Sequence, residues 1–162
     1  MMMSKQNKFI LNSILIFSIL SLSIAYFIEY VLNHRPCNLC LIERYPYIGA
    51  IILISLLFII GKFERLILIL ILFLFIFGTI ISFYHFGIEQ EYFNETLLCN
   101  LQDSVDAQSK EDLLKQLEKS APVSCKDVTF RFFGLSLATI NTIISFFLSV
   151  IIFKILKNYV QD

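Results

Sequence analysis

The sequence is short of charged residues, which make up only 16% of its 162 positions. This scarcity, together with 57% apolar residues and a mean hydropathy of +0.77, excludes an ordinary soluble globular protein. The formal net charge is zero and no basic patch stands out, so nucleic acid is not an expected partner. The composition predicts a small integral membrane protein with a single membrane domain over residues 1–162.

The first apolar run, residues 9–32, also lacks a clear small-x-small cleavage site. A cleavable signal peptide has an apolar core of about 7–15 residues, which is shorter than this run. At about 1.5 Å per residue the run is long enough to cross a hydrocarbon core of roughly 30 Å. Further apolar runs at 40–60, 66–86 and 132–153 predict an all-α bundle of four transmembrane helices.

Basic residues in the short polar segments indicate the orientation of this bundle. They gather on the side that holds both termini, as Lys5, Lys8, Lys62, Arg65, Lys154 and Lys157. The positive-inside rule makes that side cytoplasmic, so segments 33–39 and 87–131 are external. All four cysteines fall in or beside these external segments. Cysteines on an oxidising side predict two disulfides, although four cysteines permit three pairings.

The external segment 87–131 is polar and has too few apolar residues for a core of its own. Within it, Ser109-Lys110-Glu111-Asp112 is typical of a helix start, and Leu113, Leu114 and Leu117 then share one face. We expect a long external loop that carries a short amphipathic helix, either solvated or lying on the membrane surface.

A C-x-x-C pair, Cys37 and Cys40, opens the second span within the stretch Arg35-Pro36-Cys37-Asn38-Leu39-Cys40-Leu41-Ile42-Glu43-Arg44. Exposed N–H groups and the dipole at a helix start stabilise a thiolate, and Cys40 lies further into the helix. Redox pairs, structural disulfides and halves of zinc sites all use this spacing. The other ligand types, Cys99, Cys125, His34 and His85, lack tight zinc spacing, so no metal is expected.

Arg44 follows Cys40 by four residues, hence on the same helix face one turn deeper. A fixed cation there would stabilise the Cys40 thiolate and an anion on a neighbouring acceptor. Alternatively, Arg44 snorkels to the interface or pairs with Glu43 or Glu29. His85 is either an ordinary interfacial residue or a hydrogen-bond donor and proton source beside a reducible carbonyl group. Glu43 is assigned no more than a helix-surface or loop-anchoring role.

The second cysteine pair, Cys99 and Cys125, lies in the polar loop and is too widely spaced for a self-contained redox motif. The pair is either a stabilising disulfide, worth about 3 kcal/mol through loop closure, or an exchangeable disulfide.

The stretch around Cys37 resembles the P-C-x-L-C-x-x-E-R motif of the DsbB family of disulfide bond formation proteins. Cys99 and Cys125 resemble the second cysteine pair of that family. Tyr84-His85 and the stretch Phe132-Phe133-Gly134-Leu135-Ser136-Leu137 are similar to its third and fourth helices. The resemblance implies an enzyme, a quinone-dependent protein-disulfide oxidoreductase of the bacterial inner membrane.

The resemblance also implies an order of electron transfer. A periplasmic thiol oxidase resembling DsbA would attack a Cys99–Cys125 disulfide at Cys99, and a Cys37–Cys40 disulfide would then reoxidise the loop pair. Cys40, assisted by Arg44 and with His85 at the same site, would pass the electrons to bound ubiquinone or menaquinone. The disulfide of a DsbA-type protein is a strong oxidant, with a reduction potential of about −120 mV. Regenerating it from the dithiol therefore needs an acceptor of still higher potential.

Two other functions are weighed against this one. Vitamin K epoxide reductases are also helical bundles with C-x-x-C, but there the motif belongs to the last helix of the core, whereas Cys37 and Cys40 open the second span. A non-enzymatic four-span scaffold would hold structural disulfides that no partner exchanges.

Overall fold

The computed structural model describes residues 5–61, 63–94, 99, 125–126, 131–132 and 134–161. Within this part of the chain, four helical spans are long and apolar enough to cross a membrane, which confirms the predicted fold class. The short helix expected at residues 109–117 lies outside the described residues.

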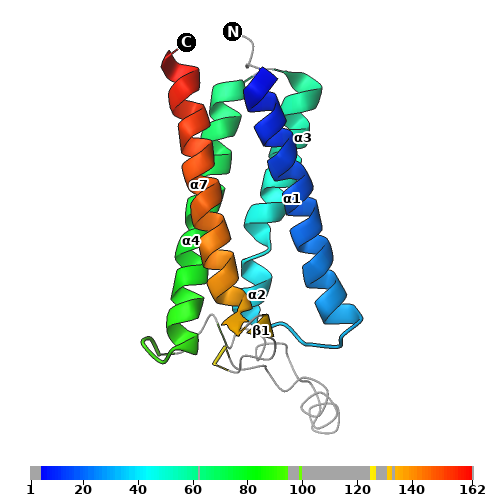
Figure 1. The fold of residues 1–162 in the computed structure, drawn as a ribbon, viewed down its shortest axis with the longest axis vertical. Helices are drawn as coiled ribbons and strands as arrows, with labels where there is room; N and C mark the ends of the chain where they lie inside the picture. Colours follow the sequence, from blue (N-terminus) through cyan, green and yellow to red (C-terminus); the bar gives the residue numbers. More distant parts are fainter. Residues whose placement is uncertain are drawn as a thin grey trace, which may run out of the picture.

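Long helices form the bundle: α1 (Lys5–Tyr30), α3 (Tyr45–Ile60), α4 (Glu64–Glu89) and α7 (Leu137–Gln161). A short helix, α2 (Asn38–Ile42), precedes α3 in the second span. Both termini lie at one end of the bundle, and α2 lies near the other end (Figure 1). Because the number of spans is even, the start of α1 and the end of α7 lie on the same side of the bundle, as expected from the sequence.

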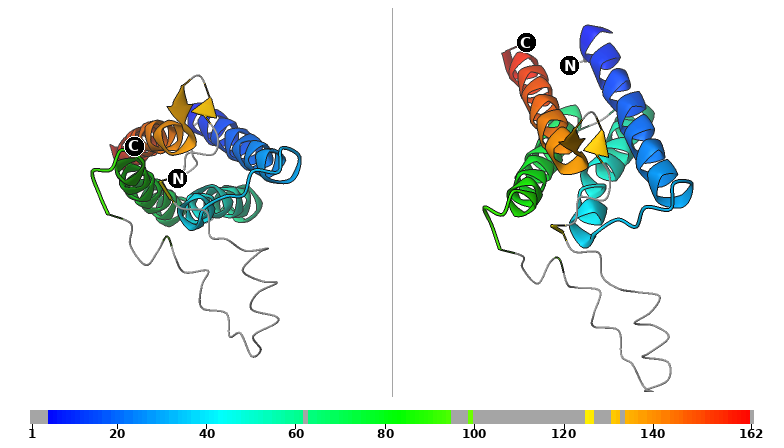
Figure 2. Two further views of the ribbon diagram at one scale, coloured as in Figure 1. Left: turned by 90° about the horizontal axis from the view of Figure 1, so that it is seen from below. Right: turned by 60° about the horizontal axis from the view of Figure 1, so that its bottom comes forward.

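The fourth helix begins at Leu137, later than the expected 132, because the preceding residues form a small antiparallel ribbon. Its strands are β1 (Arg131–Phe132) and β2 (Leu135–Ser136). Gly134 between them has a φ of +81°, a conformation that glycine adopts without strain. The ribbon lies at the start of α7, on the side that faces α1 (Figure 2).

The second span is not one continuous helix, since Glu43 and Arg44 form a turn between α2 and α3. Pro46 has no N–H to donate to the preceding turn, and its ring would crowd the carbonyl of Ile42. Proline is instead well tolerated in the first turn of α3, where it lies. The break corrects the expectation that Cys40 and Arg44 share the face of a single helix.

Three pairs of helices pack against each other and hold the bundle together. α4 packs against α7, α1 packs against α3, and α3 also packs against α4. Gly78 lets α4 approach α3 closely, because a Cβ atom there would lie 3.0 Å from the ring of Pro46. The apolar core contains Leu11, Ile54, Leu68, Ile71, Phe75 and Ile152.

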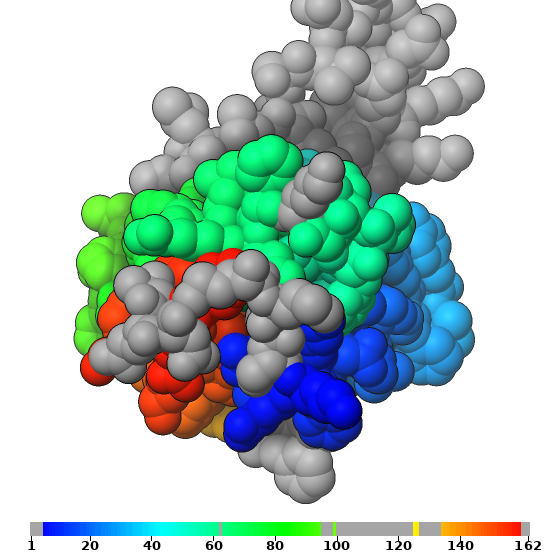
Figure 3. Space-filling view, turned by 90° about the horizontal axis from the view of Figure 1, so that it is seen from above, coloured from blue at the N-terminus to red at the C-terminus, as the bar shows by residue number. Residues whose placement is uncertain are grey.

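Of the described residues, those of α1 and α7 make little direct contact with each other. Figure 2, seen from below, shows the helices arranged as a ring in which α7 adjoins α4 and α1 adjoins α3. At the opposite end, the start of α1, the end of α7 and the turn between α3 and α4 lie side by side (Figure 3). The fourth side of the ring, between α1 and α7, is where the cavity described below lies.

Candidate functional site

The C-x-x-C pair lies at the start of α2. Cys37 is the N-cap residue, and its Sγ accepts a hydrogen bond from the backbone N–H of Cys40 at 3.3 Å. The Sγ atoms of Cys37 and Cys40 are 2.8 Å apart, and both residues are free cysteines. The two sulfur atoms therefore lie close together at the start of α2, next to each other in space. The oxidised pairing stays a prediction.

Cys37 lies at the edge of the span, whereas the sequence favoured Cys40 as the thiolate. The pKa of the Cys37 thiol is lowered from 9.0 to about 5. The hydrogen bond with the Cys40 side chain contributes most to this lowering, and the hydrogen bond and charge of His85 add to it. Burial of the thiol opposes both effects but does not cancel them.

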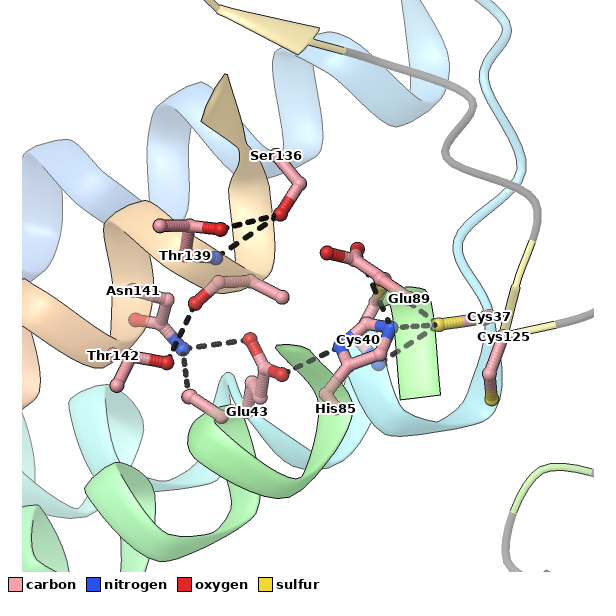
Figure 4. A network of polar contacts seen from close by, with 12 residues as sticks. Cys37, Cys40, Glu43, His85, Glu89, Cys125, Ser136, Thr139, Asn141 and Thr142 are labelled. Carbon is pink, nitrogen blue, oxygen red and sulfur yellow. Dashed lines mark hydrogen bonds and ion pairs between the residues drawn. The ribbon is translucent and has the colours of Figure 1, made fainter. Parts of the chain in front are cut away.

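His85 joins the cysteine pair to a buried carboxylate. Its Nε2 lies 3.5 Å from Cys37 Sγ, and its Nδ1 lies 2.7 Å from Glu43 Oε1 (Figure 4). Only 3% of His85 and 8% of Glu43 are exposed. Glu43 is therefore a buried partner of His85, and the helix-surface role assigned to it from the sequence is wrong. Glu89, one turn after His85 on α4, places Oε1 3.9 Å from the same Nε2.

The second oxygen of Glu43 is held by Asn141 of α7. Asn141 Nδ2 donates to Glu43 Oε2 and to Ser82 Oγ, each at 2.7 Å, and Asn141 Oδ1 accepts from the Tyr47 hydroxyl. These side chains come from α3, α4, α7 and the turn before α3, so one amide links three spans. Sequence reasoning missed Asn141, Tyr47 and Ser82. The available signal was a lone amide in an apolar span, where a polar side chain needs a partner.

Arg44 forms an ion pair with α1. Its Nη1 lies 2.5 Å from Glu29 Oε2, and its guanidinium carbon lies 4.9 Å from the centre of the Tyr26 ring. The side chains of Arg44 and Glu29 are 12% and 21% exposed, so the pair is largely sheltered. Of the alternatives drawn from the sequence, the pair with Glu29 is the one that the structure contains.

A cavity of about 570 Å³ lies beside these groups. Its polar end is lined by Cys37, Cys40, Glu43, Arg44, His85 and Glu89. Most of the remaining wall is apolar and comes from α1 and α7, through residues such as Phe17, Leu22, Ile24, Phe27, Leu137 and Ile144. Several of these side chains are also well exposed, among them Ile24 at 59% and Phe27 at 55%. The cavity therefore joins the polar groups to a wall of apolar side chains.

The loop cysteines lie against the C-x-x-C pair. Cys99 and Cys125 are joined by a disulfide and form one buried cluster with Cys37, Leu39 and Ile88. The Asn38 amide donates to the Cys99 carbonyl at 3.0 Å, which ties the loop to α2. Each loop cysteine is only 2% exposed, although both were expected to lie in a water-exposed loop. All four cysteines are thus brought to one end of the bundle.

The same groups offer atoms that suit a metal ion. Cys37, Cys40 and His85 place their ligand atoms within 4.8 Å of one another. Thiolate and imidazole are the ligands that zinc prefers. The sequence spacing had argued against zinc, and the absence of a metal from the working protein stays a prediction.

Comparison with known proteins agrees with this geometry. The family model of the Disulfide bond formation protein DsbB matches residues 7–155. An uncharacterised protein of Rickettsia prowazekii (strain Madrid E) is 30% identical over 150 residues, covering 89% of this chain and 87% of the relative. No solved structure matches the chain. Because the family model covers most of the chain, including all four spans and both cysteine pairs, the protein belongs to the DsbB family of membrane proteins for disulfide bond formation.

Proposed function

We propose that this protein is a thiol:quinone oxidoreductase that reoxidises a periplasmic DsbA-like dithiol oxidase and passes the electrons to a membrane quinone. The cavity between α1 and α7 carries the proposal, because Cys40 and Arg44 both line it. Apolar walls with a few convergent polar groups are typical of sites for small organic ligands. A volume of about 570 Å³ is sufficient for a quinone ring and part of its tail.

The residues fit a quinone at the polar end of the cavity. A bound ubiquinone or menaquinone would supply a two-electron acceptor that is dissolved in the membrane. Arg44 would stabilise negative charge on a quinone oxygen, since a guanidinium keeps its charge at any relevant pH. His85 would donate a hydrogen bond to a carbonyl oxygen from the same wall. Cys40 would present the sulfur from which the electrons leave.

The loop disulfide is the proposed point of entry for electrons. A thiolate of the reduced partner would attack Cys99, and Cys125 would leave as a thiolate. Cys125 would then attack Cys37, and Cys40 would leave. The membership of Cys99, Cys125 and Cys37 in one buried cluster supports this exchange, because it brings both cysteine pairs to the same end of the bundle. The second thiol of the partner would then attack the mixed disulfide and release Cys99, which closes the disulfide of the partner. Cys99 would attack Cys125 and release Cys37, so the loop disulfide is restored and the electron pair resides on the dithiol of Cys37 and Cys40.

We infer that the protein lies in a bacterial inner membrane with both termini in the cytoplasm. Lys5 and Lys8 begin α1, Arg65 begins α4, and Lys154 and Lys157 lie near the end of α7. These cations gather at the end of the bundle that holds both termini (Figure 1). The cysteines at the other end would face the oxidising periplasm.

Purified protein tests this function directly. We expect bound quinone in the preparation, a change in its absorption spectrum when the thiols are reduced, and quinol formation with a reduced DsbA-like protein as donor. Cys40→Ser should bind quinone but form no quinol. Quinol formation from small dithiols alone would favour the reaction of a vitamin K epoxide reductase. Protein that holds no quinone and exchanges no disulfide would be a scaffold.

A further inference from the structure

Glu43 is the most completely bound carboxylate of the site, and the proposed electron path does not use it. Both of its oxygens are engaged, Oε1 by His85 Nδ1 and Oε2 by Asn141 Nδ2, each at 2.7 Å. Two hydrogen bonds from different helices fix the plane of a carboxylate as well as its position. A buried carboxylate is costly unless it is paired and hydrogen-bonded, so an arrangement this complete needs an explanation.

The orientation of His85 provides that explanation. When one ring nitrogen of a histidine binds a carboxylate, the position of the other nitrogen is also determined. Here the Glu43 bond at Nδ1 turns Nε2 toward Cys37 Sγ, 3.5 Å away. Asn141 is fixed in turn by Ser82 and Tyr47, so it cannot rotate away from Glu43 without breaking further bonds.

We propose that Glu43 and Asn141 are positioning residues that hold His85 as the proton acceptor and donor of Cys37. His85 would take the proton of the Cys37 thiol when that thiol closes the disulfide with Cys40. It would return a proton when Cys37 leaves as a thiolate after exchange with the loop pair. The proposal rests on the proposed function for its place in the reaction, and it extends that function to Glu43 and Asn141.

The step balances in atoms and electrons. Cys37 and Cys40 together lose two electrons and two protons as their S–S bond forms. A quinone takes up both electrons and both protons and becomes a quinol. The proton from Cys37 passes through His85 Nε2, which lines the same cavity as Cys40 and Arg44. In the other half of the cycle, the loop dithiol supplies the two electrons that open the Cys37–Cys40 bond.

Other charged groups near Cys37 are arranged differently. Glu89 Oε1 lies 3.9 Å from His85 Nε2, beyond hydrogen-bond distance. Arg44 is paired with Glu29, and Arg35 and His34 line the mouth of the cavity. The lowered pKa of Cys37, caused first by Cys40 and then by His85, agrees with a proton acceptor at this sulfur. Glu43 is therefore the carboxylate that acts on Cys37 through the imidazole.

The experiment measures the titration of Cys37 without any quinone. In the full chain, Cys40→Ser keeps a hydrogen-bond donor beside Cys37, while Cys99→Ala and Cys125→Ala leave Cys37 as the sole thiol. Alkylation of Cys37 by iodoacetamide is followed by mass spectrometry from pH 4 to about pH 10, because only the thiolate reacts. In this parent protein the rate should level off well below pH 9.0, the ordinary pKa of the thiol.

Glu43→Gln and Asn141→Leu are then introduced separately. Glu43→Gln removes the charge, whereas Asn141→Leu keeps the charge and removes only the bond that orients it. Each should shift the profile upward by at least one pH unit, which means about tenfold slower alkylation at a pH below both pKa values. His85→Gln should shift it by at least as much. Glu64→Gln, at the opposite end of α4, is the matched control and should titrate like the parent.

Circular dichroism and gel filtration establish that each variant is folded, so a shift in the profile is not a loss of structure. An unchanged profile in folded Glu43→Gln and Asn141→Leu, with a shift in His85→Gln, would overturn the positioning role. An unchanged profile in all three variants would also show that His85 is not the proton acceptor of Cys37. Neither result bears on quinone reduction by the unaltered protein, so failure of this inference and failure of the proposed function are distinguishable.

Discussion

Arg44 and Glu29 form an ion pair between the second span and α1, with Nη1 of the arginine 2.5 Å from Oε2 of the glutamate. The guanidinium is shared, since it also lies over the Tyr26 ring and lines the cavity with Cys40. A guanidinium has five N–H donors in a planar fork, so binding Glu29 leaves others for a ligand. The ion pair therefore holds the Arg44 guanidinium beside the cavity and leaves some of its N–H donors available to a ligand.

Arg44→Met should fold but reduce quinone much more slowly, or with much weaker apparent affinity. Loss of one donor at a developing anion typically costs about 2.7–4 kcal/mol, or roughly a hundred- to thousandfold in rate. Arg44→Lys should lie between, because lysine keeps the charge without the planar fork. Steady-state quinone reduction with a reduced partner as donor is the measurement. Rates near those of the unaltered protein in Arg44→Met would leave the cation with only a structural role.

Glu29→Gln should have a smaller effect than Arg44→Met and should act mainly on the apparent affinity for quinone. The amide can still accept a hydrogen bond from Arg44, but it no longer neutralises the charge of the guanidinium. Comparing KM and kcat of this variant with those of the unaltered protein checks the expectation. A loss as large as that of Arg44→Met would mean that Glu29 itself takes part in the reaction.

The proposed orientation in the membrane predicts which cysteines are accessible from the periplasm. After reduction, Cys99 and Cys125 should react with a membrane-impermeant thiol reagent equally fast in intact spheroplasts and in broken membranes. The comparison allows for their burial, since both side chains are only 2% exposed and should react slowly in either case. Protection of both cysteines until the membrane is broken would reverse the orientation and with it the proposed partner.

The order of exchange predicts a covalent complex. Cys125→Ala removes the thiol that would resolve a mixed disulfide at Cys99, so Cys99 should remain joined to a periplasmic thioredoxin-like protein. Non-reducing electrophoresis followed by mass spectrometry identifies the partner and the cysteine that it occupies. A partner attached to Cys37 or Cys40 would contradict the order in which the disulfides exchange.

Packing around Phe75 predicts a difference between two phenylalanines of α4. Phe75 is fully buried, whereas Phe77 is 46% exposed on the bundle surface. Phe75→Ala should destabilise the fold by less than the roughly 3–5 kcal/mol typical of soluble cores, because the ring of Phe75 contacts equally apolar lipid tails when the helices separate. Phe77→Ala should change stability little. Unfolding in mixed micelles of increasing denaturing detergent measures both, and equal losses would contradict the position of Phe75.

The sequence by itself determined the spans and the cysteine motif. Twenty or so apolar residues in a row have one stable position in a membrane, because backbone groups there must be satisfied within a helix. C-x-x-C needs no tertiary information, since a spacing of three places both sulfurs at one helix start. Cys37, Cys40 and Arg44 were therefore identifiable before any packing was known, although the break at Pro46 altered the geometry between them.

The tertiary structure decided which polar residues meet. Glu43 contacts His85 over 42 positions of sequence and Asn141 over 98, and no local pattern encodes either contact. The spans are apolar on nearly every face, so hydropathy does not indicate which side of a helix turns inward. Only the close approach of α4 to α3 and of α7 to α4 sets those rotations. Because packing alone brings Asn141, Glu43 and His85 into line, the acid that was unassignable from the sequence became the one that orients the imidazole beside Cys37.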